Sequence, residues 1–511
     1  MRKRGLLVLL CVFLMVGMLS GCGGKGGNTD SSVRTDGQEI TLKWMLAGGA
    51  YSPSDEAEVR ALYNEKLAEA LPGVQIDFEV VPFGDYAQRL QLALTAREEL
   101  DLIWSGYVIS YVNEAANGSF MAMDDLLKEY GKDMLEEIPD WAWEQQRVNG
   151  KIYSVPNMQE VTNEGKALFF QTEQGAKYMD REKLTKILNS SPTVTQEGWD
   201  AIGEYLEVLK QNGELKKGVS TASVPSFLSN TNTEAIVDNF VIVRGADEIK
   251  VEHLFERPEK QLSFDVMADW YKKGYIVEDI ASMESASQYE FKEDGNVLWA
   301  HNYFKDIEIG QRNNGRPFVD VIPIKGLPPY ISMGNAATST SIAAYSTNAI
   351  PAMEVLDLMN TKKGTDLFNL LVYGVEGKHY EMKNNKVSYI RDAQQKPLYK
   401  LERWVVGNTF NGHMLESDPD GWFEYLLNDV QGPTAETSPL LGFKPDVSKL
   451  STELTHIRAV EGEFSRSLND GALPDHRATY EEMMGKLKTA GLEKVKAELQ
   501  SQIDAFLAAK K

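Results

Sequence analysis

Seven side chains in this sequence are candidates for binding a ligand that has both flat apolar faces and hydroxyl groups. Aromatic rings stack on apolar faces, and amide or carboxylate groups pair with hydroxyls. For any one Trp, packing in a hydrophobic core is the alternative, and for Glu376 a structural turn between two glycines is the alternative. The candidates are Tyr51, Trp104, Trp299 and Trp404 as stacking platforms, with Asn302, Asn335 and Glu376 as polar partners.

The sequence lacks the short motifs of common catalytic sites. It contains no Gly-x-Ser-x-Gly nucleophile elbow, no phosphate-binding loop and no His-Glu-x-x-His zinc motif. The turn Asp418-Pro419-Asp420-Gly421 lacks the later ligands of a calcium loop, so we interpret it as a polar turn. We therefore predict no enzymatic activity, no cofactor and no metal site, while a glycosidase-like pair among the 75 acidic residues stays an open alternative.

The N-terminus predicts export and a lipid anchor. Three basic residues at positions 2–4 precede an almost continuous apolar run from Leu6 to Leu19, too short to cross a bilayer, and the run ends at Ser20-Gly21-Cys22. This order of features resembles the lipobox of bacterial lipoproteins, in which the Cys thiol is acylated. We predict a signal peptide over residues 1–21, lipidation at Cys22, and a glycine- and serine-rich flexible tether over residues 22–38.

Composition limits the partners of the exported chain. Loss of Arg2, Lys3 and Arg4 from the 53 basic residues leaves 50 against 75 acidic ones, a net charge of −25. Such a chain has no basic footprint for nucleic acid and no electrostatic attraction to anionic lipid, so the acyl anchor must hold it at the membrane. The second of its two cysteines, Cys22, is the only one left after cleavage, which rules out an internal disulfide. About 490 residues predict two large lobes.

The N-terminal part of the folded region predicts a parallel α/β sheet. Alternation marks strands at 40–46 and 74–80, a short apolar strand follows at 101–104, and helices from about Ser54 and from Asp85 separate them. Ligands bind beyond the carboxyl ends of such strands, which here carry the loops 47–51 and 104–107.

Weaker signals follow in the rest of the chain. Thr195 is a candidate helix cap, residues 295–301 form a buried strand, and residues 341–373 form a strand followed by two helices. From about Tyr480 the apolar residues recur at helical spacing to the end of the chain.

These segments, in this order, resemble the family 1 extracellular solute-binding proteins of carbohydrate ABC importers. The resemblance rests on the lipobox, the strand with Trp44, the Asp85-Tyr86 helix, the strand 101–104 and the segments 149–156 and 296–300. Residues 373–380, 404–408 and 442–511 are similar to a lipoprotein subgroup, LipO/LplA-like, with a distinctive C-terminal region.

The resemblance implies an α/β, periplasmic-binding-protein-like fold, with two α/β lobes joined by a hinge and a ligand cleft between them. Residues 39–435 would form the interleaved lobes, and residues 436–511 a C-terminal helical region. The implied function is a monomeric receptor on the extracytoplasmic face of the cell membrane. It would capture an oligosaccharide or glycan fragment for ABC permease subunits. A surface-anchored glycan-active enzyme and a peptide-binding receptor on the same scaffold are the alternatives.

Overall fold

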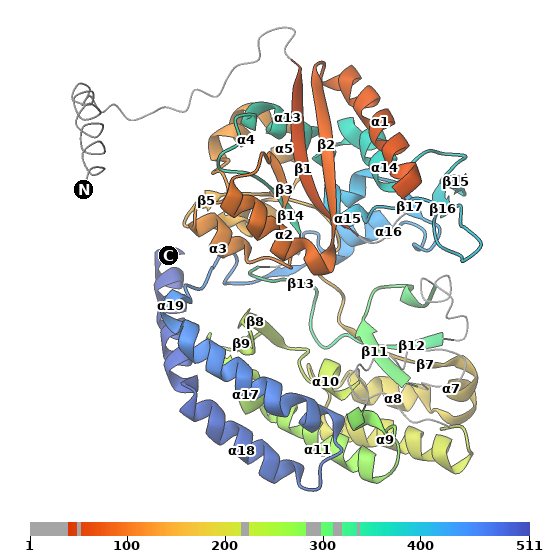
Figure 1. Cartoon of the computed structure of the whole chain (residues 1–511). Helices are drawn as coiled ribbons and strands as arrows, with labels where there is room; N and C mark the ends of the chain where they lie inside the picture. Colours follow the sequence, from red (N-terminus) through yellow and green to blue (C-terminus); the bar gives the residue numbers. More distant parts are fainter. Residues whose placement is uncertain are drawn as a thin grey trace, which may run out of the picture.

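The chain folds into two lobes connected by three stretches of polypeptide (Figure 1). The computed structural model describes residues 39–48, 53–215, 224–282, 298–309, 319–334 and 338–510. Cys22, Tyr51 and Asn335, singled out from the sequence, lie outside the described residues, as do the predicted signal peptide and tether.

The first lobe is built on a five-stranded sheet with the order β2-β1-β3-β14-β6. Strands β1, β2 and β3 are parallel, and β14 runs antiparallel to both β3 and β6. The parallel strands therefore end at the same edge, which faces the second lobe in Figure 1. The strands are β1 (Ile40–Gly48), β2 (Val74–Pro82), β3 (Leu102–Trp104), β6 (Val155–Pro156) and β14 (Ser339–Ile342).

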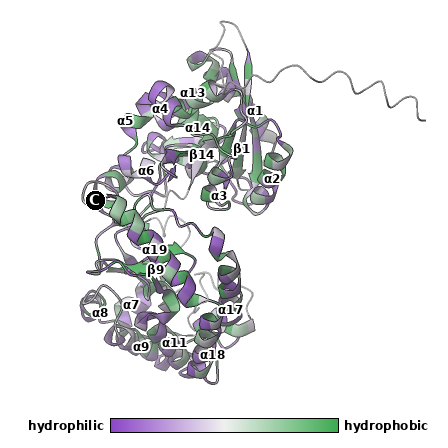
Figure 2. Cartoon of the chain, turned by 90° about the vertical axis from the view of Figure 1, so that its left-hand side faces the viewer, coloured by the Kyte–Doolittle hydropathy of each residue, from purple (hydrophilic) through white to green (hydrophobic). Residues whose placement is uncertain are grey.

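Helices cover this sheet and bury a large apolar core. Trp44, Tyr63 and Phe368 are fully buried in it, and the strands inside the lobe are coloured as strongly hydrophobic in Figure 2. The covering elements are α1 (Pro53–Ala70), α2 (Phe83–Ala96), α3 (Tyr111–Ala116), α4 (Asp124–Tyr130), α5 (Lys132–Glu137), α6 (Asp140–Glu144), the hairpin of β4 (Arg147–Val148) and β5 (Lys151–Ile152), α13 (Ala349–Asn360), η4 (Lys362–Gly364) and α14 (Thr365–Tyr373).

A small subdomain extends the first lobe after α14. Its sheet has the order β15-β16-β17, and its short helices lead back toward the second lobe. The elements are β15 (Tyr380–Lys383), β16 (Lys386–Tyr389), α15 (Arg403–Val406), η5 (Thr409–Asn411), β17 (Met414–Leu415), α16 (Trp422–Tyr425) and the π-helical turn η6 (Leu426–Val430).

The second lobe contains two three-stranded antiparallel sheets. In the first, β7 (Lys166–Gln171) lies between β11 (Leu298–Asn302) and β12 (Val319–Ile324). In the second, β9 (Phe240–Val243) lies between β8 (Thr233–Val237) and β10 (Glu252–His253). The helical elements are α7 (Thr172–Tyr178), α8 (Arg181–Leu188), α9 (Gln196–Gln211), α10 (Pro225–Leu228), η1 (Leu254–Glu256), α11 (Pro258–Lys272) and η2 (Ile280–Ser282).

Local sequence signals account for two of these helix starts. The Thr195 side chain accepts a hydrogen bond from the Gly198 N–H at 3.3 Å, which confirms the predicted cap of α9. Asp180 caps α8 in the same way, through the Lys183 N–H at 3.0 Å.

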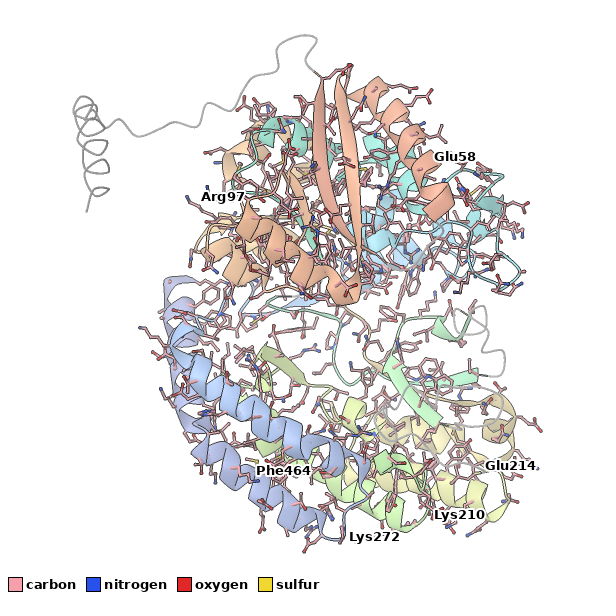
Figure 3. The ribbon with its side chains drawn as sticks, viewed as in Figure 1. Glu58, Arg97, Lys210, Glu214, Lys272 and Phe464 are labelled. Atoms are coloured by element: carbon pink, nitrogen blue, oxygen red, sulfur yellow. The ribbon has the colours of Figure 1, made fainter. Side chains whose placement is uncertain are left out.

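The C-terminal helices complete the core of the second lobe. After η7 (Ser448–Leu450) come α17 (Ser451–Asp470), α18 (His476–Thr489) and α19 (Leu492–Lys510). Helices α17 and α18 pack on α11, and α19 packs on α17, α18 and β10. Figure 3 labels Phe464 of α17 and Lys272 of α11 within this lobe. Phe240, Phe264, Leu468, Leu499 and Ile503 share one apolar cluster, so the helices belong to the second lobe's core instead of standing apart from it.

Three crossing segments connect the lobes, and hydrogen bonds tie them to one another and to the lobes. Their described residues are 157–165, 325–334 with Thr338, and 431–438. The Asn157 side chain donates to the Val405 carbonyl at 2.7 Å and accepts from Thr340 at 3.2 Å. Buried Glu234 accepts from Tyr330 Oη at 2.6 Å and from Ser438 Oγ at 2.8 Å, which joins β8 to two of the segments.

Within the described ranges, no helix combines the length and the apolar character that crossing a bilayer requires.

Candidate functional site

An aromatic cluster of Phe83, Trp104, Tyr107 and Trp404 lies at the carboxyl edge of the first lobe's parallel strands. Phe83 stacks on Trp404 with ring centroids 5.4 Å apart and planes 22° apart, and Tyr107 lies 6.1 Å from Trp404. Trp104 lies 5.9 Å from Tyr107 and 6.1 Å from Trp404. The cluster unites residues that are up to about 320 positions apart, and two of the predicted platforms, Trp104 and Trp404, are among them.

Trp104 is the buried member of the cluster, and the other three rings pack against it. It is the last residue of β3, its side chain is fully buried, and the hydroxyl of Tyr86 donates to its carbonyl at 2.7 Å. The chain then folds back over the indole: a Cβ at Gly106 would lie only 2.0 Å from the ring, so only glycine fits there. This corrects the prediction of Trp104 as a stacking platform, because Tyr107, which is 64 % exposed, presents the open ring surface.

Trp404 is partly buried and is fixed by the crossing segments. It lies in α15, and its carbonyl accepts from Thr338 Oγ1 at 2.8 Å. Asn157 also donates to this carbonyl, at 3.4 Å. The backbone of Trp404 is therefore fixed by residues of two of the segments that would have to bend if the lobes moved.

Trp299 is a packing residue and not an open platform. Its indole is 7 % exposed and stacks on Phe169 of the neighbouring strand, with centroids 4.8 Å apart. Trp422 and Phe423 of α16 belong to the same apolar cluster. This corrects the prediction of Trp299 as a stacking platform, because α16 and η6 cover the face of β11 that carries Trp299.

Asn302, at the end of β11, lies in a cationic corner of the second lobe. Its Oδ1 accepts from Lys166 Nζ at 2.9 Å, and Arg244 lies close enough to add to the electrostatic effect on Lys166. Burial first, and then the charge of Arg244, lower the pKa of Lys166 to about 8. We refer to Lys166, Arg244 and Asn302 as the cationic corner.

Glu376 lies apart from the aromatic cluster. Its exposed side chain lines a surface groove of about 490 Å³ between α1 and α14, and none of the four aromatic rings lines that groove. The structure therefore does not bring Glu376 together with the other candidates. The groove is also lined by Leu62, Glu65, Lys66, Glu69, Asp366, Asn369, Leu370, Gly374, Val375, Tyr380 and His413.

The acidic turn at 418–421 is bound by cations of the chain. Arg403 donates to both oxygens of Asp418 at 2.7 and 3.3 Å, and the Leu415 N–H donates at 2.8 Å. Asp420 pairs with Lys386 at 2.6 Å. These carboxylates hold the subdomain together, and the described residues contain no group of three His, Cys, Asp or Glu side chains arranged to hold a metal ion.

Four residues of the aromatic cluster and the cationic corner were not among the candidates predicted from the sequence: Phe83, Tyr107, Lys166 and Arg244. Phe83 and Tyr107 follow strands that end at the ligand-binding edge, which is a usable signal. Lys166 and Arg244 follow no motif; only the pairing of β7 with β11 brings Lys166 opposite Asn302.

The chain is similar to known proteins in both sequence and fold. The model of the family "Domain of unknown function (DUF3502)" matches residues 439–508, the region of α17–α19. A protein described as "Carbohydrate ABC transporter substrate-binding protein", from Streptococcus pneumoniae serotype 4, is 26% identical over 506 residues, covering 96% of each chain.

Solved structures extend the similarity to the whole architecture. The N-glycan transport solute binding protein NgtS from Streptococcus pneumoniae matches with a TM-score of 0.75 at 23% identity, covering 93% of this chain and 100% of that chain. In complex with Man5GlcNAc, NgtS matches with a TM-score of 0.64 at 24% identity, again covering 93% and 100%. The fold of this chain is therefore the two-lobed, periplasmic-binding-protein-like α/β fold of solute-binding proteins.

Proposed function

We propose that this chain is an extracytoplasmic solute-binding protein of an ABC importer, which captures an oligosaccharide and delivers it to the permease subunits. The observation that carries the proposal is the aromatic cluster, placed at the strand ends of one lobe and facing the other. Ligands of open α/β sheets bind at this edge.

The chemistry of the cluster suits a sugar. Tyr107, Trp404 and Phe83 present ring surface next to one another, and the apolar C–H faces of sugar rings stack on such surfaces. In the second lobe, the side-chain amide of Asn302 is a group that pairs with hydroxyls. A ligand with alternating apolar and hydroxyl faces would engage both lobes.

The relatives support the same substrate class. The Streptococcus pneumoniae protein that is 26% identical is described as a carbohydrate ABC transporter substrate-binding protein, and NgtS is described in complex with Man1GlcNAc and Man5GlcNAc. We further propose membership of the LipO/LplA-like subgroup, on the resemblance of residues 373–380, 404–408 and 442–511 to that subgroup.

We propose that binding acts through a hinge. A ligand favours a closed form only through contacts that it makes with both lobes together. The motion would take place in the crossing segments defined above, residues 157–165, 325–334 with Thr338, and 431–438.

The remaining parts of the proposal concern location and state. Acylation of Cys22 would retain a monomeric receptor at the outer face of the membrane, and the glycine-rich residues after it would let the body reach its permease. We propose that the protein has no catalytic activity.

Titration of the mature chain with oligosaccharides of mannose and N-acetylglucosamine tests the proposal. Saturable binding with a thermal stabilisation of about 2.7 kcal/mol at 100 times the dissociation constant, and no new product by chromatography, is the expected result. Turnover of the glycan would support an enzyme instead. Binding to peptides and to no glycan would support a peptide receptor.

A further inference from the structure

Lys166 has no carboxylate partner in the part of the chain that the structure describes. Its Nζ donates to Asn302 Oδ1 at 2.9 Å and lies 4.2 Å from the ring centroid of Phe227. A neutral amide and a ring compensate an ammonium only in part. With a pKa lowered to about 8 by burial and by Arg244, Lys166 still carries its charge at neutral pH.

Arg244 is held in a fixed orientation beside it. Its guanidinium carbon lies 4.1 Å from the ring centroid of Tyr330, and Nη2 donates to the Pro328 carbonyl at 2.8 Å. Its nearest acidic group is Glu436, 3.8 Å away and 55% exposed. Buried Glu234, whose oxygens accept from Tyr330, Ser438 and the Met333 N–H, also lies close enough to act electrostatically on Arg244.

Both cations lie where the crossing segments enter the second lobe. Lys166 begins β7 directly after the segment 157–165, and the Tyr330 N–H donates to Thr162 Oγ1 at 3.1 Å within the same junction. Figure 1 shows α10 and β11 at the edge of the second lobe that faces the first. The cationic corner is therefore on the side of the lobe where the proposed ligand would bind.

Neighbouring cations of this lobe are neutralised within the chain. Lys325, also at the junction, pairs with Glu164 at 3.3 Å, and Arg181 pairs with Asp320 at 2.6 Å. Lys166 differs from both, because no carboxylate among the described residues lies within ion-pair distance of its Nζ, whereas Glu436 and Glu234 act on Arg244. A chain with a net charge of −22 has ample acidic residues to pair such a lysine, so its isolation stands out.

We infer that the cationic corner is a subsite for an anionic substituent of the glycan, either a sugar carboxylate or a sulfate ester. The inference rests on the proposed function and narrows its substrate class to acidic oligosaccharides. Lys166 would supply a point charge, and Arg244, fixed over Tyr330, would donate in a planar fork that matches carboxylate and sulfate oxygens. The hydrogen bond from Lys166 Nζ to Asn302 Oδ1 would keep the ammonium oriented toward the anion.

The test uses the mature chain and one oligosaccharide in three forms: neutral, carrying a terminal sialic acid, and carrying one sulfate ester. Calorimetric titration should show that at least one acidic form binds about tenfold more tightly than the neutral form, as expected for a charge-assisted hydrogen bond. The preferred acidic form identifies which anion the subsite takes. Replacing Lys166→Met should reduce affinity for that form about tenfold and change affinity for the neutral form less than about twofold.

Lys325→Met is the matched control, because it removes the same charge at the same junction from a lysine that Glu164 already neutralises. It should leave the preference for the acidic form in place, and binding of the neutral form reports that each variant is folded. Equal affinity for all three forms, or an equal loss of all three in Lys166→Met, would overturn the subsite and leave the proposed function standing. Binding of none of them would overturn both.

Discussion

The facing edges of the two lobes differ in their chemistry. The first lobe presents rings, with Tyr107 and Trp404 resting on buried Trp104. The second lobe presents charge and amide groups, through Lys166, Arg244 and Asn302. An edge of rings recognises shape and apolar surface, whereas an edge of cations and amides selects among polar substituents. The difference predicts that the first lobe supplies most of the affinity and the second lobe most of the selectivity.

The lobes also differ in how they are built. The first lobe is built around a five-stranded sheet, with smaller sheets beside it. The second lobe has two three-stranded sheets, and three C-terminal helices complete its core. Substitutions in the C-terminal helices should therefore act on the second lobe.

Truncation of a C-terminal core residue gives the largest expected effect. Leu499 of α19 is fully buried in the cluster shared with Phe240 and Phe264. Leu499→Ala should lower the free energy of unfolding by about 2–5 kcal/mol, through lost burial and the cavity left behind. Denaturant titration measures it, with Leu92→Ala, at a side chain that is 59% exposed on the first lobe, as the control. A loss below about 1 kcal/mol would show that the helices are not part of the core.

Removal of the partly buried Trp404 ring tests the aromatic edge itself. Trp404→Ala should weaken oligosaccharide binding about 10- to 100-fold, because it deletes the surface shared by Phe83 and Tyr107. Trp404→Phe keeps a ring and should recover most of the affinity in the same calorimetric titration. Full affinity in Trp404→Ala would remove the cluster from the binding site.

A methyl group added at Gly106 tests how the ring edge is supported. Its Cβ would lie 2.0 Å from the Trp104 indole, so Gly106→Ala must displace Trp104 or Tyr107. We expect about a tenfold loss of sugar affinity, a smaller effect than loss of a whole ring. Gly84→Ala, next to Phe83 in the sequence, is the control. Apart from its chain neighbours, no heavy atom lies within 4 Å of the added Cβ. Equal affinities of the two variants would contradict the supporting role of Trp104.

The smallest expected effect concerns the free energy of unfolding at acidic pH, through a carboxylate of the second lobe. Burial alone would raise the pKa of Asp265 on α11, but hydrogen bonds from Arg477 and His476 of α18 outweigh it and hold the pKa below its usual value. A lowered pKa stabilises the fold above the unfolded-state value, and this stabilisation disappears as pH falls through the folded-state value.

At neutral pH, Asp265→Asn should therefore cost about 0.5–1 kcal/mol, a modest figure because the pair is partly exposed. The cost should shrink as pH falls below about 4. Thermal unfolding across this range measures it, with Asp269→Asn, which breaks only an exposed pair with Lys273, as the control. A cost that is independent of pH would contradict the ionic origin.

The sequence predicted the elements with strong local signals. Alternation gave the strands of the first lobe, Thr195 gave a helix start, and the apolar spacing after Tyr480 gave helices at the C-terminus. The length of the chain predicted two lobes, and the resemblance supplied their periplasmic-binding-protein-like fold. Burial was harder to predict: Trp104 and Trp299 have the right residue type, but the Gly106 loop covers one and α16 covers the other. The cationic corner depends on strand pairing across more than 130 residues, which leaves no local pattern.

A distance measurement between the lobes tests the central claim most directly. Spin labels at Leu92→Cys in the first lobe and Lys272→Cys in the second, in a Cys22→Ala background, would be the only thiol-linked groups in the mature chain. Addition of a bound oligosaccharide should shorten the distance, and Trp404→Ala should require more ligand for the same change. A distance that stays constant while the sugar is bound would contradict capture by closure of the two lobes.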